Sequence, residues 1–566
     1  MKKIRLRKDK LKVFPFEQIN VKGEIGHRMD LTAGKILNHI DIENDFARHY
    51  KQRTETPDVH GGFTGYGMFL DAMVSASKWK ISAKGIKKLK DRLLRELIAS
   101  QSDDGSISIF LNKKGMWDNH DQAYIIQALI NDYRFFKNKK ALDAAYRLGD
   151  YLISISSTPN IGMEKAFLML YQESGEKRYL DFLKDKLYIQ YSLEDYDNVL
   201  EINGLQHVYT CIARILAQVQ SLSIDKLSCK TFLESSQNLY NKIFCKGYAS
   251  ISGSCTGSYL WGEIWDRTQI GLGKWGETCA SAYLMRWAAE MIKLTGDSVY
   301  GDLFERVMYN AFFASQSKDG LLQRYFTPFN ETGEWYSHDT YCCPNNFRRM
   351  MFEVPDSVYL CSKDAVWLNL YTDSSLETPT LKIVQKTGYP EKEHISVEIY
   401  SEKNIDLRFR IPRWCDNATI KINGECDSCQ SGTWYICKVK NKELTKIQLT
   451  LPMPVRYVRG TMAQQDRIAI MRGPLVYAIE QELNSLSFIH FDLLECMRES
   501  ARVNTEEQVR IHQKCLVPNT NHQECDVIFT RFTEPKRSKT YFERKNYPKD
   551  KTGTVRDELF DSPHSM

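Results

Sequence analysis

Four residues with metal-binding side chains occur in two short motifs that lie far apart in the sequence. Glu277 and Cys279 are two positions apart before an amphipathic helix, and Cys342 and Cys343 are adjacent. A disulfide between neighbouring cysteines is strained, so a vicinal pair in a reducing compartment suggests metal binding. Three thiolates and one carboxylate would complete the tetrahedral shell that zinc prefers, and coordination would deprotonate the thiols. Because neither motif has zinc-finger spacing, buried cysteines without a ligand are the alternative.

Two other motifs match known binding patterns but lie in the wrong context. Residues 426–429 have Cys-x-x-Cys spacing, yet no second pair lies at a matching distance, so we interpret them as two incidental thiols in a hairpin turn. Residues 271–276 match the glycine pattern of dinucleotide-binding loops. No apolar strand precedes them, so a nucleotide site is not expected.

Composition and charge limit the classes of protein to which the chain can belong. It has 566 residues, 42% hydrophobic and 26% charged, and a net charge of +6. This length predicts at least two domains. Because acidic and basic residues are interspersed, no nucleic-acid partner is expected.

The sequence predicts a cytoplasmic protein without a membrane partner. Its basic start is followed by a short apolar stretch that Pro15 interrupts, unlike the continuous core of a secretory signal. No segment has about 18 consecutive apolar residues, as a membrane-spanning helix requires. The cysteines are odd in number, and none occurs before Cys211, so a disulfide framework is not expected.

The elements that must position the motifs fall into a helical half and a strand-rich half. From residue 62 to 360, apolar residues recur at helical spacing, and turns with glycine at 173–176 and 293–297 separate successive helices. Stacked helix pairs could form a bundle, a solenoid or a closed toroid, and periodicity does not choose among them. After Pro355 the apolar residues alternate in short runs, which is typical of a β-sandwich.

This pattern predicts four parts of the chain. They are an N-terminal segment over residues 1–25 that could pack on the β-domain, a helical catalytic domain over 26–355, a β-sandwich over 356–480, and a β-rich extension with a loose tail over 481–566.

Three motifs, in the same order, resemble glycoside hydrolase family 127, which contains β-L-arabinofuranosidases. The motifs are Glu277-Thr-Cys279-Ala-Ser, Cys342-Cys343-Pro344-x-Asn346 and Arg472-Gly-Pro-Leu-Val-Tyr477. The resemblance covers roughly residues 63 to 477. It implies a multidomain α+β architecture, in which an (α/α)6 barrel that carries the site is followed by β-sandwich modules.

The resemblance also implies roles for the four metal-binding residues. Glu277, Cys279, Cys342 and Cys343 fall on the zinc ligands of the family. Cys342 falls on its nucleophile, where a retaining glycosidase normally uses one of two carboxyl groups.

Further positions would transfer protons or contact the sugar. Glu263, in a Gly-Glu motif before the Glu-Thr-Cys motif, is the candidate general acid and base. His120 and His207 fall on positions that supply imidazoles to the family's sugar pocket, and Trp261 and Tyr325 are candidate stacking faces. Without the resemblance, a lone histidine is more often a capping or surface residue, and an aromatic residue more often belongs to the core.

One segment departs from the family pattern. Residues 162–165 read Gly-Met-Glu-Lys where alignment expects Gly-His-Gln-Glu, so Met163 replaces an imidazole and Lys165 introduces a cation. The identity of the sugar is therefore open.

The expected function is that of a retaining, Zn²⁺-dependent exo-glycosidase. Its substrate would be an oligosaccharide or glycoside that carries terminal β-L-arabinofuranose or a related unusual sugar. Two alternatives remain, namely an inactive carbohydrate-binding protein with structural zinc, and a helical-barrel sugar epimerase or lyase. A homodimer is a candidate assembly.

Overall fold

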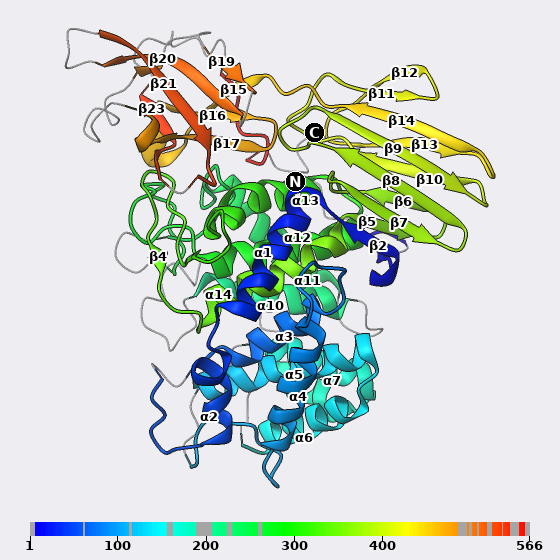
Figure 1. The fold of residues 1–566 in the computed structure, drawn as a ribbon, viewed down its shortest axis with the longest axis vertical. Helices are drawn as coiled ribbons and strands as arrows, with labels where there is room; N and C mark the ends of the chain where they lie inside the picture. The colour runs from blue at the N-terminus through cyan, green and yellow to red at the C-terminus, as the bar shows by residue number, and fades with distance from the viewer. Residues whose placement is uncertain are drawn as a thin grey trace.

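The computed structural model shows a helical barrel with three larger β-sheets against it (Figure 1). It describes residues 6–8, 10–59, 63–112, 116–155, 162–187, 207–222, 229–257, 263–484, 495–496, 501–505, 509–517, 523–534, 536–543 and 554–560. None of the described helices is both long enough and apolar enough to cross a membrane.

Helices that pack in a closed ring form the inner wall of the barrel. In ring order they are α3 (Tyr66–Ala76), α5 (Met116–Phe136), α7 (Met163–Ser174), α10 (Val208–Ser221), α12 (Thr278–Thr295) and α14 (Cys342–Glu353), and α14 packs again on α3. Each inner helix is covered by one outer helix, in the same order α4 (Ile86–Ala99), α6 (Lys139–Ile155), α8 (Lys177–Leu187), α11 (Cys229–Tyr240), α13 (Val299–Val307) and α1 (Gly23–Asn38). The helix pairs therefore form the predicted (α/α)6 toroid.

The sequence of each helix reflects its place in the two rings. Every residue of the inner helix α3 is buried, whereas the outer helix α4 buries a single apolar stripe, as expected of an amphipathic surface helix. Gly175 and Gly296 end α7 and α12 with φ of 69° and 70°. This left-handed conformation favours glycine and stops a helix, which confirms the two predicted turns.

Two sheets follow the barrel. The five-stranded sheet has the order β1 (Lys12–Val13), β5 (Tyr359–Ser362), β6 (Ala365–Leu368), β10 (Ile405–Arg410) and β13 (Trp434–Val439). The seven-stranded sheet has the order β12 (Glu425–Cys429), β11 (Ala418–Ile422), β14 (Leu444–Thr450), β9 (His394–Ser401), β8 (Leu381–Thr387), β7 (Ser374–Thr378) and β2 (Ile19–Val21). Strand β9 alternates between exposed and buried residues along its whole length, as a sheet with one face in the core requires.

The interpretation of residues 426–429 as a hairpin turn is wrong. These residues lie in strand β12, with Cys426 exposed and Cys429 buried. The turn lies immediately before this strand, at Asn423 and Gly424. Their φ angles of 48° and 104° belong to the tight turn that joins β11 to β12. All cysteines whose side chains are described are free thiols.

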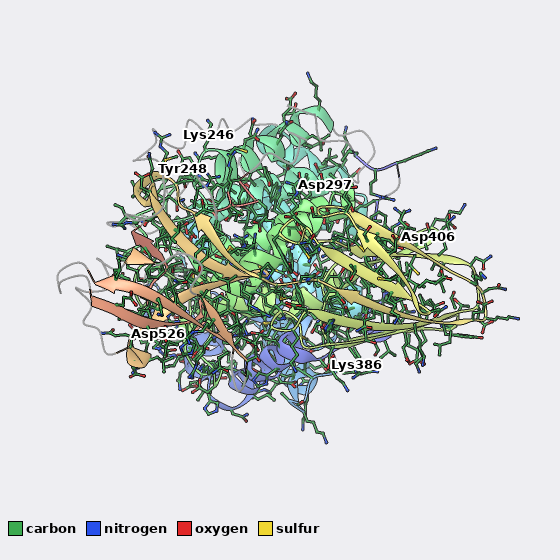
Figure 2. The ribbon with its side chains drawn as sticks, turned by 90° about the horizontal axis from the view of Figure 1, so that it is seen from above. Lys246, Tyr248, Asp297, Lys386, Asp406 and Asp526 are labelled. Carbon is green, nitrogen blue, oxygen red and sulfur yellow. The ribbon has the colours of Figure 1, made fainter. Side chains whose placement is uncertain are left out.

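A third sheet, of nine strands, combines strands from residues 455–480 with strands from the C-terminal part of the chain. Its order is β15 (Val455–Arg459), β16 (Arg467–Arg472), β23 (Tyr541–Glu543), β18 (Glu495–Cys496), β20 (Arg510–Val517), β21 (Gln523–Arg531), β17 (Leu475–Glu480) and β22 (Arg537–Lys539), and β19 (Arg502–Asn504) pairs with β20. Seen from above, Asp526 of β21 and Lys386 of β8 lie on opposite sides of the molecule (Figure 2).

A buried ion-pair cluster joins the barrel to the five-stranded sheet. Arg410 of β10 pairs with Asp302 and with Glu305 of α13, and its Nη2 atom lies 2.8 Å from Glu305 Oε1. The hydroxyl of Tyr389 donates a hydrogen bond of 2.8 Å to the same carboxylate oxygen. Because an unpaired buried charge is costly, these contacts tie the sheet to the outer wall of the barrel.

Candidate active site

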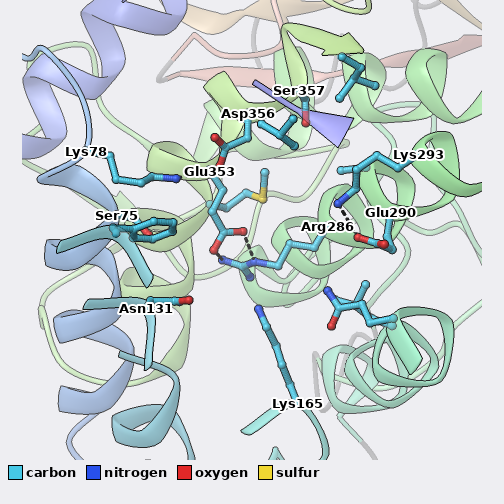
Figure 3. Close-up of a pocket in the computed structure, with 17 residues that line it drawn as sticks. Ser75, Lys78, Asn131, Lys165, Arg286, Glu290, Lys293, Glu353, Asp356 and Ser357 are labelled. Atoms are coloured by element: carbon cyan, nitrogen blue, oxygen red, sulfur yellow. Dashed lines mark hydrogen bonds and ion pairs between the residues drawn. The ribbon is translucent and has the colours of Figure 1, made fainter. Parts of the chain in front are cut away.

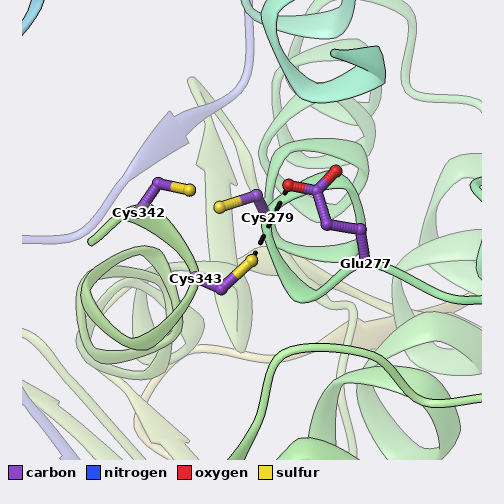
Figure 4. Close-up of side chains that lie close together, drawn as sticks. All are labelled: Glu277, Cys279, Cys342 and Cys343. Atoms are coloured by element: carbon purple, nitrogen blue, oxygen red, sulfur yellow. Dashed lines mark hydrogen bonds between the residues drawn. The ribbon is translucent and has the colours of Figure 1, made fainter. Parts of the chain in front are cut away.

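The two sequence motifs meet at the N-terminal ends of neighbouring inner helices. Glu277 precedes α12 and Cys279 lies in its first turn, while Cys342 and Cys343 begin α14. Since α12 packs on α14, the four side chains converge (Figure 4). One ligand atom from each lies within 4.8 Å of every other. The structure therefore brings all four predicted metal ligands together in one buried group, which we call the thiol cluster.

The thiol cluster gathers acidic groups where two helix ends supply partial positive charge. Helix N-termini favour anions such as thiolates. Burial raises the pKa of the Cys279 and Cys343 thiols and of the Glu277 carboxyl well above their ordinary values. Cys342 differs, because hydrogen bonds from Cys279 and then from Cys343 hold its pKa well below the usual range for a thiol. Cys342 is therefore the thiol of the cluster that ionises most readily.

The donor set of the thiol cluster fits a Zn²⁺ ion. Glu277 Oε1 accepts a hydrogen bond of 3.7 Å from the Cys343 thiol, but Glu277 Oε2 is buried and has no hydrogen-bond partner. A buried oxygen without a partner is costly in a folded protein. A cation would satisfy it, and three sulfurs with one carboxylate are ligands that zinc accepts.

Asn346, which follows Cys343 by three residues in the same sequence motif, supports the cluster. Its Nδ2 atom donates a hydrogen bond of 3.2 Å to Cys279 Sγ, and its Oδ1 atom accepts one of 3.0 Å from Arg349. Arg349 is in turn paired with Asp71 at 2.7 Å. The signal for this contact was the spacing, because a residue three positions after Cys343 lies on the same face of a helix.

The backbone is strained at the residue before Cys342. Tyr341 has a φ of 69° and a ψ of −177°, and such values cost a residue other than glycine about 1–3 kcal/mol. Two hydrogen bonds hold it there: its N–H donates to Thr64 O at 3.1 Å, and its carbonyl accepts from Asn345 Nδ2 at 2.7 Å. These contacts set the direction in which the chain enters α14, and thus where the Cys342 sulfur points.

Glu263 lies next to the Cys342 sulfur. The Tyr325 hydroxyl donates a hydrogen bond of 2.7 Å to Glu263 Oε1 and lies 3.3 Å from Cys342 Sγ. The sum of these two distances, 6.0 Å, is an upper bound on the separation of Glu263 Oε1 and Cys342 Sγ. The paired catalytic groups of retaining glycosidases lie about 5–5.5 Å apart, so the spacing suits that reaction.

His207 lies against the second oxygen of Glu263. Its Nδ1 atom lies 2.7 Å from Glu263 Oε2. Burial disfavours the charged imidazole, but the Glu263 carboxylate outweighs burial and raises the pKa of His207. The Val208 N–H donates to the Glu263 carbonyl at 3.0 Å, which fixes the glutamate against the start of α10.

His120 is buried in the barrel. Its Nε2 atom lies 3.2 Å from the Tyr209 hydroxyl. Gly162 packs against its ring so closely that a Cβ atom at position 162 would lie 2.7 Å from His120 Nδ1. Met163, next to this glycine, is fully buried in the core. Trp261, the other predicted sugar-stacking residue, lies outside the described residues.

Comparison with known families assigns the chain to one of them. The model of the β-L-arabinofuranosidase GH127 catalytic domain matches residues 34–356, and that of the GH127 middle domain matches residues 365–453. The chain belongs to glycoside hydrolase family 127. It is therefore a glycoside hydrolase, which acts on sugar substrates.

Individual relatives agree with this assignment. The chain is 22% identical to the non-reducing end β-L-arabinofuranosidase of Bifidobacterium longum subsp. longum over 495 residues, which are 70% of this chain and 72% of the relative. The crystal structure of a GH127 β-L-arabinofuranosidase from Geobacillus stearothermophilus T6 matches with a TM-score of 0.75 and 19% identity, over 93% of this chain and 100% of that one. A second GH127 β-arabinofuranosidase structure matches with a TM-score of 0.78 and 18% identity, over 96% and 99%. These likenesses confirm the predicted fold, a helical barrel followed by β-sheet domains.

Proposed function

We propose that the protein is a retaining glycosidase in which Cys342 is the nucleophile and Glu263 is the general acid and base. The observation that supports this most strongly is the bound of 6.0 Å between Glu263 Oε1 and Cys342 Sγ, which suits a retaining pair. The substrate would carry a terminal β-L-arabinofuranose or a related sugar, because the Bifidobacterium relative is named a non-reducing end β-L-arabinofuranosidase.

The reaction would take two steps. In the first, Cys342 Sγ attacks the anomeric carbon, the bond from that carbon to the leaving oxygen breaks, and Glu263 donates its proton to the oxygen. In the second, the Glu263 carboxylate takes a proton from water, the water oxygen attacks the same carbon, and the carbon–sulfur bond breaks. Each step inverts the carbon, so the sugar leaves with its original configuration.

The neighbouring side chains would keep Glu263 in position for both steps. Tyr325 contacts one of its carboxylate oxygens and His207 the other, so the carboxyl group cannot rotate freely. We also propose that His120, His207, Trp261 and Tyr325 contact the sugar, the imidazoles through its hydroxyls and the aromatic rings through its apolar face.

Glu277, Cys279, Cys342 and Cys343 would hold a Zn²⁺ ion. When bound, zinc keeps coordinating thiols ionised near neutral pH and restrains their positions. Two helix N-termini favour the ionised thiols, and so does the Asn346 amide, which donates a hydrogen bond to Cys279 Sγ. Among these groups the Cys342 thiolate would be kept beside Glu263, in position to act as the nucleophile.

The nucleophile can be identified by trapping. In a Glu263→Gln variant, a nitrophenyl β-L-arabinofuranoside still reacts in the first step, because its leaving group needs no proton, while the second step lacks its base. We expect a pentosyl adduct on the peptide that contains Cys342, detected by mass spectrometry after an acid quench. Cys342→Ala should abolish both the adduct and turnover, whereas Cys437→Ala, at a thiol equally buried in β13, should leave them unchanged. An adduct on another residue, or an inverted product in NMR spectra, would contradict the proposal.

A further inference from the structure

A cavity lies in the barrel towards the C-terminal ends of α12 and α14, whose N-terminal ends carry the thiol cluster (Figure 3). Its volume is about 200 Å³, and all six inner helices contribute to its lining. Glu353 follows Cys342 by 11 residues on α14, which corresponds to about 16 Å of helix. The cavity is therefore separate from the candidate active site.

The acidic side chains that line this cavity are all neutralised by cations. The pairs are Glu353 with Arg286, Asp356 with Lys78, and Glu290 with both Lys10 and Lys293. Burial would raise the pKa of Glu290 and of Glu353, but the surrounding cations outweigh it and lower both pKa values to about 2. The lining has four cationic side chains, those of Lys78, Lys165, Arg286 and Lys293, against three carboxylates.

Lys165 adds a further cation, which lies near Glu353 and Asp71 without contacting either carboxylate directly. Within the described part of the chain it forms neither an ion pair nor a hydrogen bond. Its side chain points from the first turn of α7 toward the Arg286 guanidinium (Figure 3). The Arg286 side chain is 5% exposed, and its buried Nη1 atom also has no hydrogen-bond partner. The half-buried Lys165 and the buried Arg286 thus face the same space with unused donors.

This arrangement is costly unless an anion occupies that space. Burial lowers the pKa of Lys165 to about 8, which shows that the charged form is disfavoured in the absence of a ligand. A lysine in the first turn of a helix also opposes the helix dipole. Lys165 belongs to the segment that departs from the family pattern, where a glutamate at this position would remove the surplus positive charge.

We propose that this cavity binds a small oxyanion of the phosphate or sulfate type between Lys165 Nζ and Arg286 Nη1. A tetrahedral oxyanion offers acceptors to both groups, and charge-assisted hydrogen bonds of this kind are strong. The bound anion would link α7 to α12 and stabilise the barrel. This site does not depend on the proposed hydrolysis, so it can be tested without an activity assay.

The first test measures the binding of inorganic phosphate to the full-length, metal-loaded protein. Calorimetric titration at constant ionic strength should show one saturable site, and the Tm should rise with phosphate because the ligand binds the folded state. Lys165→Met should weaken binding at least 10-fold, and Lys165→Arg should restore it. Lys88→Met is the matched control, because Lys88 is an exposed lysine of α4 and its loss changes the net charge equally. Absence of a saturable site, or equal affinity in Lys165→Met, would overturn the proposal.

A second test varies the pH and uses the protein without any substitution, so it does not depend on whether a variant folds. Lys165 is faced by Glu353 of α14, Arg349 of α14, Asp71 of α3 and Arg286 of α12. Because Lys165 is charged below its pKa of about 8, affinity for sulfate should decrease as the pH rises through and above this value. Sulfate keeps its charge over this range, so the protein must cause the change. An affinity that stays constant from pH 7 to pH 10 would refute the role of Lys165.

Discussion

The hydroxyl of Tyr325 should contribute to the rate by holding Glu263 beside Cys342. A Tyr325→Phe variant keeps the ring but removes the donor that lies 2.7 Å from Glu263 Oε1 and 3.3 Å from Cys342 Sγ. A hydrogen bond to a charged group contributes about 1.5–3 kcal/mol. At about 1.4 kcal/mol for each tenfold change, kcat/KM should fall about 10- to 150-fold. The contact of His207 with the other carboxylate oxygen favours the smaller value.

The dependence on the leaving group distinguishes this role from simple packing. If Tyr325 positions the general acid, the loss should be large for an alkyl or sugar leaving group and small for a dinitrophenolate, which needs no proton. Steady-state kinetics on a series of β-L-arabinofuranosides would measure both effects, mainly in kcat. Tyr336→Phe is the control, because the Tyr336 ring packs on Tyr325 at 5.2 Å between centroids. The reasoning fails if Tyr325→Phe retains its kcat/KM within twofold, or if the loss is the same for every leaving group.

Three further outcomes are expected. Cys343→Ser should lower the metal content from one ion per chain to well below one in elemental analysis, and unchanged stoichiometry would remove Cys343 from the metal site. Asn346→Ala removes the donor to Cys279 Sγ, so metal affinity in a chelator competition should fall about 10- to 100-fold; an unchanged affinity would show that the contact is incidental. Arg410→Met leaves Asp302 and Glu305 without their buried partner. This should cost about 3–5 kcal/mol of stability and lower the Tm by several degrees in calorimetry. The control is Lys446→Met, which removes an exposed pair with Glu398 at 3.8 Å and should have little effect. Equal Tm values for these two variants would argue against the role of the Arg410 cluster.

Local features of the fold were predictable from sequence, and the closure of the barrel was not. Helix periodicity and the glycines at 175 and 296 act within a few residues, so they predict where helices run and stop. The contact between α3 and α14 joins segments that lie far apart in the chain, and no periodic pattern encodes which helix faces pack. The resemblance to a family supplied that information. The error at residues 426–429 arose because this edge strand is polar and mostly exposed, so it lacks the apolar alternation that indicates a strand.

The metal ligands were predictable as a set because their residue types are unusual together. The contacts that tune these ligands were harder to predict from the sequence. Tyr325 was predicted as a stacking face, and nothing in its sequence context shows that its hydroxyl lies between Glu263 and Cys342. Lys165 was evident as a departure from the family pattern, but its meeting with Arg286 inside the barrel (Figure 3) depends on how α7 packs against its neighbours.

The two N-terminal strands have a consequence for synthesis of the protein. Strands β1 and β2 are edge strands of two different sheets, and their partners β5 and β7 begin at Tyr359 and Ser374. Lys12 contacts Cys361, 349 residues later. At about 5–20 residues per second, a ribosome needs roughly 20–70 s to supply that partner. During this interval β1 lacks the strand with which it pairs, although the barrel helices that follow it can already pack. We therefore expect β1 and β2 to join their sheets only after the barrel helices have formed.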